Sequence, residues 1–276
     1  MTHRLSTSRG RPWAAALLVA ALSGLCLTLA PAPATAASKH SAASKIPRTA
    51  DGKPDFSGIW QTTSLADFDL EPHAGRKDAP PGPGVVEGNS IPYLPAALEQ
   101  KKKNFEARLS NDPRLKCITP GVPRSVYTPE PFQIFQRKRD LTLYHQFGGN
   151  VRTIHTNQTE HPAEPNDWWL GDSRGSWEGD TLVVDVKHFN DVTWLDRAGN
   201  FHSDALHVVE RWSFLDNNTL AYKATVEDAK VFSRPWTIDI ILHRHREKNF
   251  QVIENYCFTQ EYEQFYPPKP PVEGAP

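Results

Sequence analysis

Two histidines of this chain could share one face of a β-hairpin. His145 and His155 flank a Gly-Gly-Asn segment of the kind that forms tight hairpin turns. A three-residue loop would make Leu143 face His155 and would put both imidazoles diagonally on one apolar face, with Arg152 on the opposite face. A two-residue loop would instead pair His145 with Arg152. Two imidazoles on one face could transfer protons or share a ligand or metal ion, and each could also be a hydrogen-bonded core residue.

A second predicted hairpin pairs Leu215 with Leu220 around an Asn-Asn turn. That register puts His207, Arg211 and Tyr222 on one face, which suits the wall of a semi-polar cavity. In such a wall His207 would transfer protons, Arg211 would hold an anionic substrate group and Tyr222 would pack on the substrate. The other face of the first strand, outward or covered by a helix, carries Glu210, Trp212 and Phe214.

A long connection over residues 189–203 gathers further reactive groups. Asp191 and His202 are a carboxylate and an imidazole, the usual components of a general base, and Trp194 offers an apolar platform. Binding residues favour such loops on a rigid scaffold, so we expect this connection to form a lid over a barrel mouth. The aspartate could instead be a turn or capping residue.

Cofactor and metal motifs are sparse. The chain has no HExxH or CxxC spacing, no P-loop, no Rossmann fingerprint and no Gly-x-Ser-x-Gly. His243 and His245 could place two imidazoles on one strand face, but the arginines beside them favour a solvated strand end. We therefore expect no organic cofactor and assign no metal ligand, while a bound metal ion is left open.

The elements that would position these residues are mostly strands. Tight turns separate expected strands near Trp60 and at residues 132–137, 141–147, 151–157, 173–177, 181–189, 207–215, 220–227, 237–246 and 250–258. So many strands in succession exclude an alternating α/β fold. The prediction is all-β, a single antiparallel barrel of about 8–10 strands, because closure removes free sheet edges.

The chain before these strands is predicted to be less regular. Residues 63–93 contain many prolines and glycines, which suit neither a helix nor a central strand. One short helix is expected over residues 94–109, with Leu98, Phe105 and Leu109 on a shared face.

The ends of the chain and its charge indicate an exported protein. Residues 1–36 combine an arginine-containing start, an apolar stretch and a small-residue triplet, which is the pattern of a cleavable signal peptide. We expect a flexible leader at 37–54, the barrel domain at 55–265 and a Pro-rich tail at 266–276. A net charge of −1 and the lack of a basic stripe argue against nucleic acid as a partner. The predicted location is periplasmic or secreted, without stable membrane insertion after cleavage, and the oligomeric state is left open.

Two cysteines, Cys117 and Cys257, remain after cleavage of the predicted signal peptide. An even pair in an exported protein favours a disulfide, with two buried thiols as the alternative. The bond would tie an early loop to the last strand.

Several sequence blocks resemble a large family of exported, mostly uncharacterised bacterial proteins. The blocks lie at residues 55–60, 145–152, 177–185, 189–196 and 202–211, where they read DFSGIW, HQFGGNVR, WEGDTLVVD, FNDVTWLD and HSDALHVVER. The resemblance extends from Pro54 to Cys257 and implies that these blocks are shared features, but it implies little about a reaction. Gly58-Ile-Trp60 ahead of an antiparallel meander also resembles the opening of a lipocalin-type or calycin-like barrel.

These patterns together predict an exported β-barrel enzyme that acts on a small hydrophobic molecule, aromatic or terpenoid-like. The chemistry would be general acid–base without an organic cofactor, of the lyase, decarboxylase or isomerase type. A non-catalytic lipocalin-like carrier of small molecules is the first alternative, and a metal-dependent hydrolase is the second.

Overall fold

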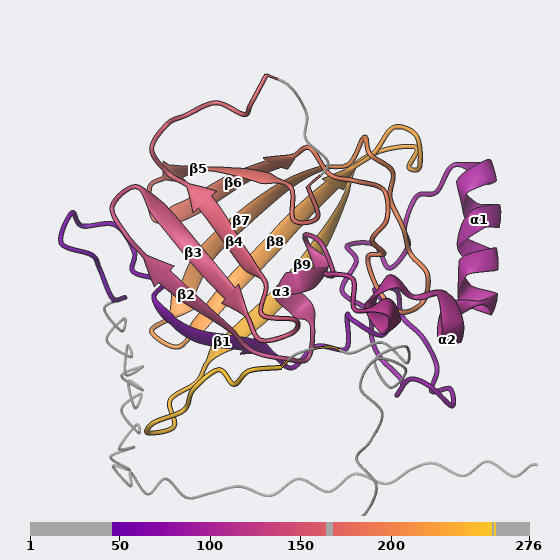
Figure 1. Cartoon of the computed structure of the whole chain (residues 1–276), viewed down its shortest axis with the longest axis horizontal. Coiled ribbons are helices and arrows are strands. Elements are labelled where there is room, and N and C mark those ends of the chain that lie inside the picture. Colours follow the sequence, from indigo (N-terminus) through magenta and orange to yellow (C-terminus); the bar gives the residue numbers. More distant parts are fainter. Residues whose placement is uncertain (1–45, 164–167, 256, 258–276) are drawn as a thin grey trace, which may run out of the picture. The chain divides into compact units, whose positions relative to one another are not determined.

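Nine strands close into a barrel in the computed structural model, which describes residues 46–163, 168–255 and 257 (Figure 1). The strands are β1 (Gly58–Thr62), β2 (Phe132–Gln136), β3 (Asp140–His145), β4 (Val151–His155), β5 (Asp172–Glu178), β6 (Thr181–Lys187), β7 (His207–Asp216), β8 (Thr219–Glu227) and β9 (Trp236–Arg244). Each strand pairs with the next along the chain, and β1 pairs with β9 to close the barrel. The described residues all fall within one compact unit, Ser41–Pro276.

The core fills the barrel because apolar residues alternate along the strands. In β8, Leu220, Tyr222, Ala224 and Val226 are buried and alternate with more exposed residues, and β6 and β9 show the same alternation. Trp60 on β1 is fully buried, and the Arg244 guanidinium lies 4.2 Å from its ring centroid. An interior occupied by large side chains makes this barrel a packed core.

One pair of neighbouring strands departs from the predicted antiparallel meander. β4 and β5 run parallel, and they pair only through Ile154 with Ser173 and His155 with Arg174. A parallel pair requires a crossover connection, and the long segment between these two strands provides it. The expectation of a purely antiparallel barrel was therefore wrong at this place, which we call the β4–β5 seam.

The last expected strand, at residues 250–258, is not formed in the part of it that the structure describes, 250–255 and 257. β1 already occupies the free edge of β9, so this segment has no sheet edge to join. The segment instead turns back, and Phe250 stacks on His245 with 3.8 Å between ring centroids. The other predicted strands are present, with ends shifted by a few residues.

The chain forms four short helical segments, of which α1 and α2 lie to one side of the barrel (Figure 1). They are α1 (Pro95–Glu106), α2 (Arg108–Asn111), the 3₁₀ turn η1 (Pro113–Lys116) and α3 (Arg124–Tyr127). The predicted helical region is thus confirmed but interrupted at Ala107. The predicted apolar face is wrong, because Leu98 and Leu109 are exposed and α1 buries only Ala97. α3 is buried throughout.

A disulfide joins Cys117 to Cys257, with 5.3 Å between their Cα atoms, as predicted. Cys257 does not lie on the last strand, because that strand ends at Arg244. The predicted signal peptide, the first part of the leader and the Pro-rich tail lie outside the described residues. Among the described residues, no helix has the length and apolar character needed to span a membrane.

Candidate functional site

The β4–β5 seam opens into a pocket of about 610 Å³. One wall is the first part of β4 and the other is the chain that leads into β5. The pocket is lined by Cys117, Ile118, Thr119, Asn150, Val151, Arg152, Thr153, His155, Trp168, Trp169, Leu170, Gly171, Asp172 and Ser173. Its volume lies within the range of small-molecule sites, roughly 300–1,000 Å³.

The seam opens because residues 168–171 follow the β6 side of the barrel and leave β4. The amide of Trp168 donates to the carbonyl of His188 at 3.2 Å, and Asn190 donates back to Trp168 at 3.0 Å. Gly171 then turns the chain into β5 with a φ of +67°. A Cβ on this glycine would lie 2.7 Å from Val186 Cγ1, so only glycine suits both the conformation and the space.

Two adjacent tryptophans form the apolar part of the pocket. Trp168 and Trp169 are each 43% exposed, which is high for side chains of this size. Val151 faces them from β4 and is also exposed. Flat aromatic surfaces in this position can stack on an apolar ligand.

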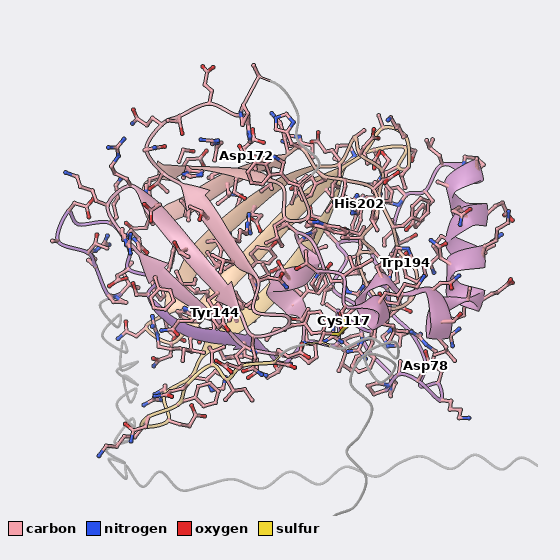
Figure 2. The ribbon with its side chains drawn as sticks, in the orientation of Figure 1. Asp78, Cys117, Tyr144, Asp172, Trp194 and His202 are labelled. Carbon is pink, nitrogen blue, oxygen red and sulfur yellow. A yellow bond between two sulfur atoms is a disulfide. The ribbon has the colours of Figure 1, made fainter. Side chains whose placement is uncertain are left out.

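Asp172 supplies a carboxylate whose partners are fixed. Arg174 donates to both of its oxygens at 2.7 and 2.8 Å, and His161 Nδ1 lies 2.6 Å from Oδ2 (Figure 2 labels Asp172). Burial acts to raise the pKa of Asp172, but Arg174 and His161 outweigh it and lower that pKa below its ordinary value. The carboxylate therefore stays ionised near neutral pH and adds negative charge to the pocket.

His155 is the predicted catalytic histidine that the structure places in this pocket. It ends β4 on the outer face and is half-buried. None of the described residues forms a hydrogen bond or ion pair with its ring. An imidazole in this state can accept or donate a proton.

The barrel interior beneath the seam holds a buried ion pair. Arg152 donates to both carboxylate oxygens of Glu210, at 3.0 and 2.5 Å, and its Nε donates to Ser173 Oγ at 3.0 Å. The Tyr222 hydroxyl donates to the same carboxylate at 2.8 Å. Burial, followed by the Glu210 charge, raises the pKa of Tyr222 well above its ordinary value. Tyr222 is therefore internal, as predicted, but its hydroxyl serves the ion pair.

The first hairpin has a different register from the one predicted. His145 faces Asn150, and Leu143 faces Arg152, so the loop has four residues and includes two glycines in the left-handed region. This register turns Arg152 inward and His155 outward, and the prediction of a shared His145–His155 face was wrong. The loop is longer than the predicted one because the two glycines can adopt left-handed conformations, which are compatible with several hairpin loop lengths.

His145 is buried in the core. Neither ring nitrogen has a hydrogen-bond partner among the described residues, and the ring packs 5.4 Å from that of Phe132. Burial, followed by the positive charge of Arg152, lowers the pKa of His145 to about 3. His145 is therefore a neutral core residue near neutral pH, outside the seam pocket.

The second hairpin is shifted by a β-bulge between Phe214 and Asp216. The shift turns Glu210 and Trp212 inward, opposite to the prediction. Arg211 points outward and pairs with Glu178 at 2.7 Å. The prediction that Arg211 lines an internal cavity was wrong for this reason.

His207 also lies on the outer face, away from the pocket lining. Its Nε2 lies 2.8 Å from Asp185 Oδ1, and its Nδ1 lies 3.4 Å from Glu227 Oε2. His161 Nε2 lies 3.6 Å from the same Asp185 oxygen. Among the described residues, no group of three or more His, Cys, Asp or Glu is arranged to hold a metal ion.

The connection at 189–203 does not assemble the predicted carboxylate–imidazole pair. Asp191 is exposed, whereas the ring of His202 is buried and bonds to Thr193 Oγ1 at 2.7 Å and to the carbonyl of Ser203 at 2.9 Å. Burial lowers the pKa of His202. Trp194 is half-buried, and Figure 2 shows Trp194 and His202 apart from Asp172.

Sequence reasoning missed most of the pocket. Trp168 and Trp169 lie outside the strands, between β4 and β5, so no alternation pattern marked them, and Asp172 is the first residue of β5. The available signal was the adjacent tryptophan pair itself, because two large aromatics outside an apolar strand seldom both become buried.

No protein-family model matches the chain, and the search of curated proteins finds no match either.

Proposed function

We propose that this protein is an enzyme that binds a small, flat, partly hydrophobic molecule in the seam pocket and uses His155 to transfer a proton. One observation carries the proposal: the pocket holds two exposed tryptophans beside an imidazole that has no bond to the described residues. An apolar platform with a few polar groups is the usual composition of a small-molecule site. A titratable group at its edge is suited to act on whatever the platform holds.

The proposed chemistry is general acid–base catalysis without an organic cofactor. His155 would take a proton from one atom of the substrate and return it to another, which is an isomerisation, or would protonate a carbanion left by a decarboxylation or elimination.

The barrel interior is a weaker candidate for the site than the seam pocket. Its volume is taken up by large buried side chains such as Trp60, Trp212 and Phe132. Its charged groups, Arg152 and Glu210, neutralise each other. The predicted internal cavity is thus replaced by a site beside the barrel wall.

A non-catalytic carrier is the second candidate, and one observation favours it. The carboxylate of Asp172 and the guanidinium of Arg152 are already bonded to protein groups, so His155 is the pocket group left for proton transfer. A carrier needs only the tryptophans and the space between them. For a metal-dependent hydrolase, the described residues offer no supporting arrangement.

We also infer export and a lipocalin-like ancestry. The disulfide and the signal-like residues 1–36 support a periplasmic or secreted location. Gly58 and Trp60 on the first strand of a closed barrel support the lipocalin-like relationship.

The test is an incubation screen with purified protein and a library of aromatic, terpenoid and ester compounds. Mass spectrometry of the free and the protein-bound pools shows which compounds are converted and which are only retained. We expect the unchanged protein to convert one of the compounds. His155→Gln should abolish formation of the product while the compound still binds, and Trp168→Ala should reduce product formation because the compound binds more weakly. His243→Gln is the matched control, because His243 is an exposed histidine on β9 outside the pocket lining. Undiminished turnover by His155→Gln would contradict the proposal, and retention without conversion would identify a carrier.

A further inference from the structure

The first part of β4 presents a free strand edge inside the seam pocket. The amide of His145 donates to the carbonyl of Asn150 at 2.8 Å, so the backbone of Asn150 faces β3. Alternate residues of an antiparallel strand direct their backbone groups to opposite sides. Val151 and Thr153 therefore direct their N–H and C=O groups away from β3, towards β5.

β5 pairs with only the last part of this edge. The parallel ladder joins Ile154 to Ser173 and His155 to Arg174. In a parallel ladder of this register, the carbonyl of Thr153 and both backbone groups of His155 are used. Both groups of Val151 and the N–H of Thr153 have no partner among the described residues.

The unpaired edge and the apolar platform belong to the same pocket. Val151 and Thr153 line one wall, and Trp168 and Trp169 line the other. An unpaired edge is a ready template for another extended chain, and proteins usually cover or shorten such edges. Peptide-recognition domains use an edge of this kind to bind a ligand by strand addition.

We propose that the molecule bound in the seam pocket is peptide-like and pairs with Val151 as a short additional strand. This proposal rests on the seam pocket being the functional site, and it names the class of substrate. One –NH–CHR–CO– unit of the ligand accepts from the N–H of Val151 and donates to its C=O. An aromatic or apolar side chain of the ligand then packs on Trp168 and Trp169.

The pocket chemistry favours this class over a hydrocarbon or an acid. A hydrocarbon leaves the N–H and C=O of Val151 unpaired, and a carboxylate can satisfy only donors. The pocket volume of about 610 Å³ limits the ligand to a few residues.

The test uses two probes of one shape. N-acetyl-phenylalanine methylamide carries both strand-pairing groups, and its depsipeptide analogue has an ester oxygen in place of the phenylalanine N–H. Tryptophan fluorescence measures binding of each probe, and amide hydrogen exchange by NMR reports on the strand edge. We expect the amide probe to slow exchange at Val151 but not at Leu143, whose amide already faces β4 within the β3–β4 ladder. The ester analogue should bind roughly two- to tenfold more weakly, the loss expected for one hydrogen bond.

A pair of variants tests the protein side of the contact. Val151→Pro removes the edge N–H without removing a ladder bond, which an edge strand tolerates. Val151→Ala keeps the N–H and is the matched control. We expect the proline variant to lose affinity for the amide probe and the alanine variant to keep it.

The outcomes separate this inference from the proposed function. Binding of the amide probe without slower exchange at Val151 would overturn the strand pairing and leave the seam pocket as the site. Slow exchange at the Val151 amide before any probe is added would also overturn it, because the edge would already be paired, for example with a second copy of the chain. If no probe and no library compound perturbs the tryptophan fluorescence, the proposed function fails and the strand pairing fails with it.

Discussion

Arg152 on β4 and Glu210 on β7 form a two-bond ion pair across the barrel interior, with both side chains almost completely buried. The two strands are not neighbours, because β5 and β6 lie between them in the sheet. The pair therefore links opposite walls directly, beneath a seam where backbone pairing is sparse.

Removing one partner of this pair should be strongly destabilising. We expect Glu210→Gln or Arg152→Met to lower the free energy of unfolding by about 3–5 kcal/mol, because the remaining charge stays buried without a partner. The double variant Arg152→Met with Glu210→Met should recover most of the loss. Urea unfolding measures each value.

Arg211→Met is the matched control for that series. Its partner Glu178 is exposed, so solvent screens the pair and the loss should be less than about 1 kcal/mol. Equal losses for the two arginines would contradict the assigned strand register.

Acid should destabilise the protein partly through His145. Its pKa of about 3 in the folded state lies below the ordinary value of 6.5, so the unfolded chain binds a proton first as the pH falls. The free energy of unfolding then decreases by about 1.4 kcal/mol per pH unit between these two values, and this residue has no effect above the upper one.

His145→Phe tests this expectation because phenylalanine keeps a ring against Phe132. Between pH 6 and pH 4.5, the free energy of unfolding should fall by about 2 kcal/mol less in the variant than in the unchanged protein, as measured by denaturant titration. His243→Gln, at an exposed position, should keep the original pH dependence. Parallel pH curves for the unchanged protein and His145→Phe would show that the imidazole titrates normally.

Gly171→Ala should damage the seam pocket. The new methyl group would meet Val186 and Phe189 at 2.7 and 2.8 Å, and the residue would be strained at a φ of +67°. We expect the free energy of unfolding to fall by about 1–3 kcal/mol and any pocket ligand to bind more weakly. Gly179→Ala separates the two causes, because its φ is also positive but nothing lies within 4 Å of the added atom. If Gly171→Ala lowers the free energy of unfolding no more than Gly179→Ala does, crowding at the pocket wall is unimportant.

Cleavage of the disulfide should affect both stability and the pocket. Closing a loop of this length contributes about 4–5 kcal/mol in the chain-entropy model, and often less in practice. Cys117 also lines the pocket, so its release should weaken ligand binding. Cys257→Ser with Cys117→Ser, compared in urea unfolding and in binding assays, measures both effects. Unchanged ligand affinity would show that Ile118 and Thr119 hold their wall without the bond.

The strand pattern of the sequence was sufficient to predict a barrel, because alternation and turn residues are local properties. Strand register was not predictable in the same way. The bulge after Phe214 and the four-residue loop after His145 each change the register of a hairpin whose alternation fits more than one register, and each reversed the assignment of a face. Arg211 and His155 were misplaced for that reason, whereas Tyr222 was placed correctly because it alternates with apolar residues along β8.

The seam could not be predicted because it depends on a long-range arrangement. Nothing in residues 156–171 indicates that β5 will lie parallel to β4, and the pocket exists only because the two strands diverge. The cysteine pair was predictable, since the parity of cysteines does not depend on register.

The closure of the barrel has a consequence for the order of events during synthesis. β1 leaves the ribosome long before its partner β9, because translation runs from the first residue to the last. β2 to β8 can pair in succession as they appear, but Trp60 stays uncovered on one side until Arg244 and its neighbours have been made. The covalent ring from Cys117 to Cys257 then forms last and encloses every barrel strand except β1. A nascent chain arrested before β9 would therefore expose the second edge of β1, which β2 does not cover, and this is the stage at which a holding chaperone would be most useful.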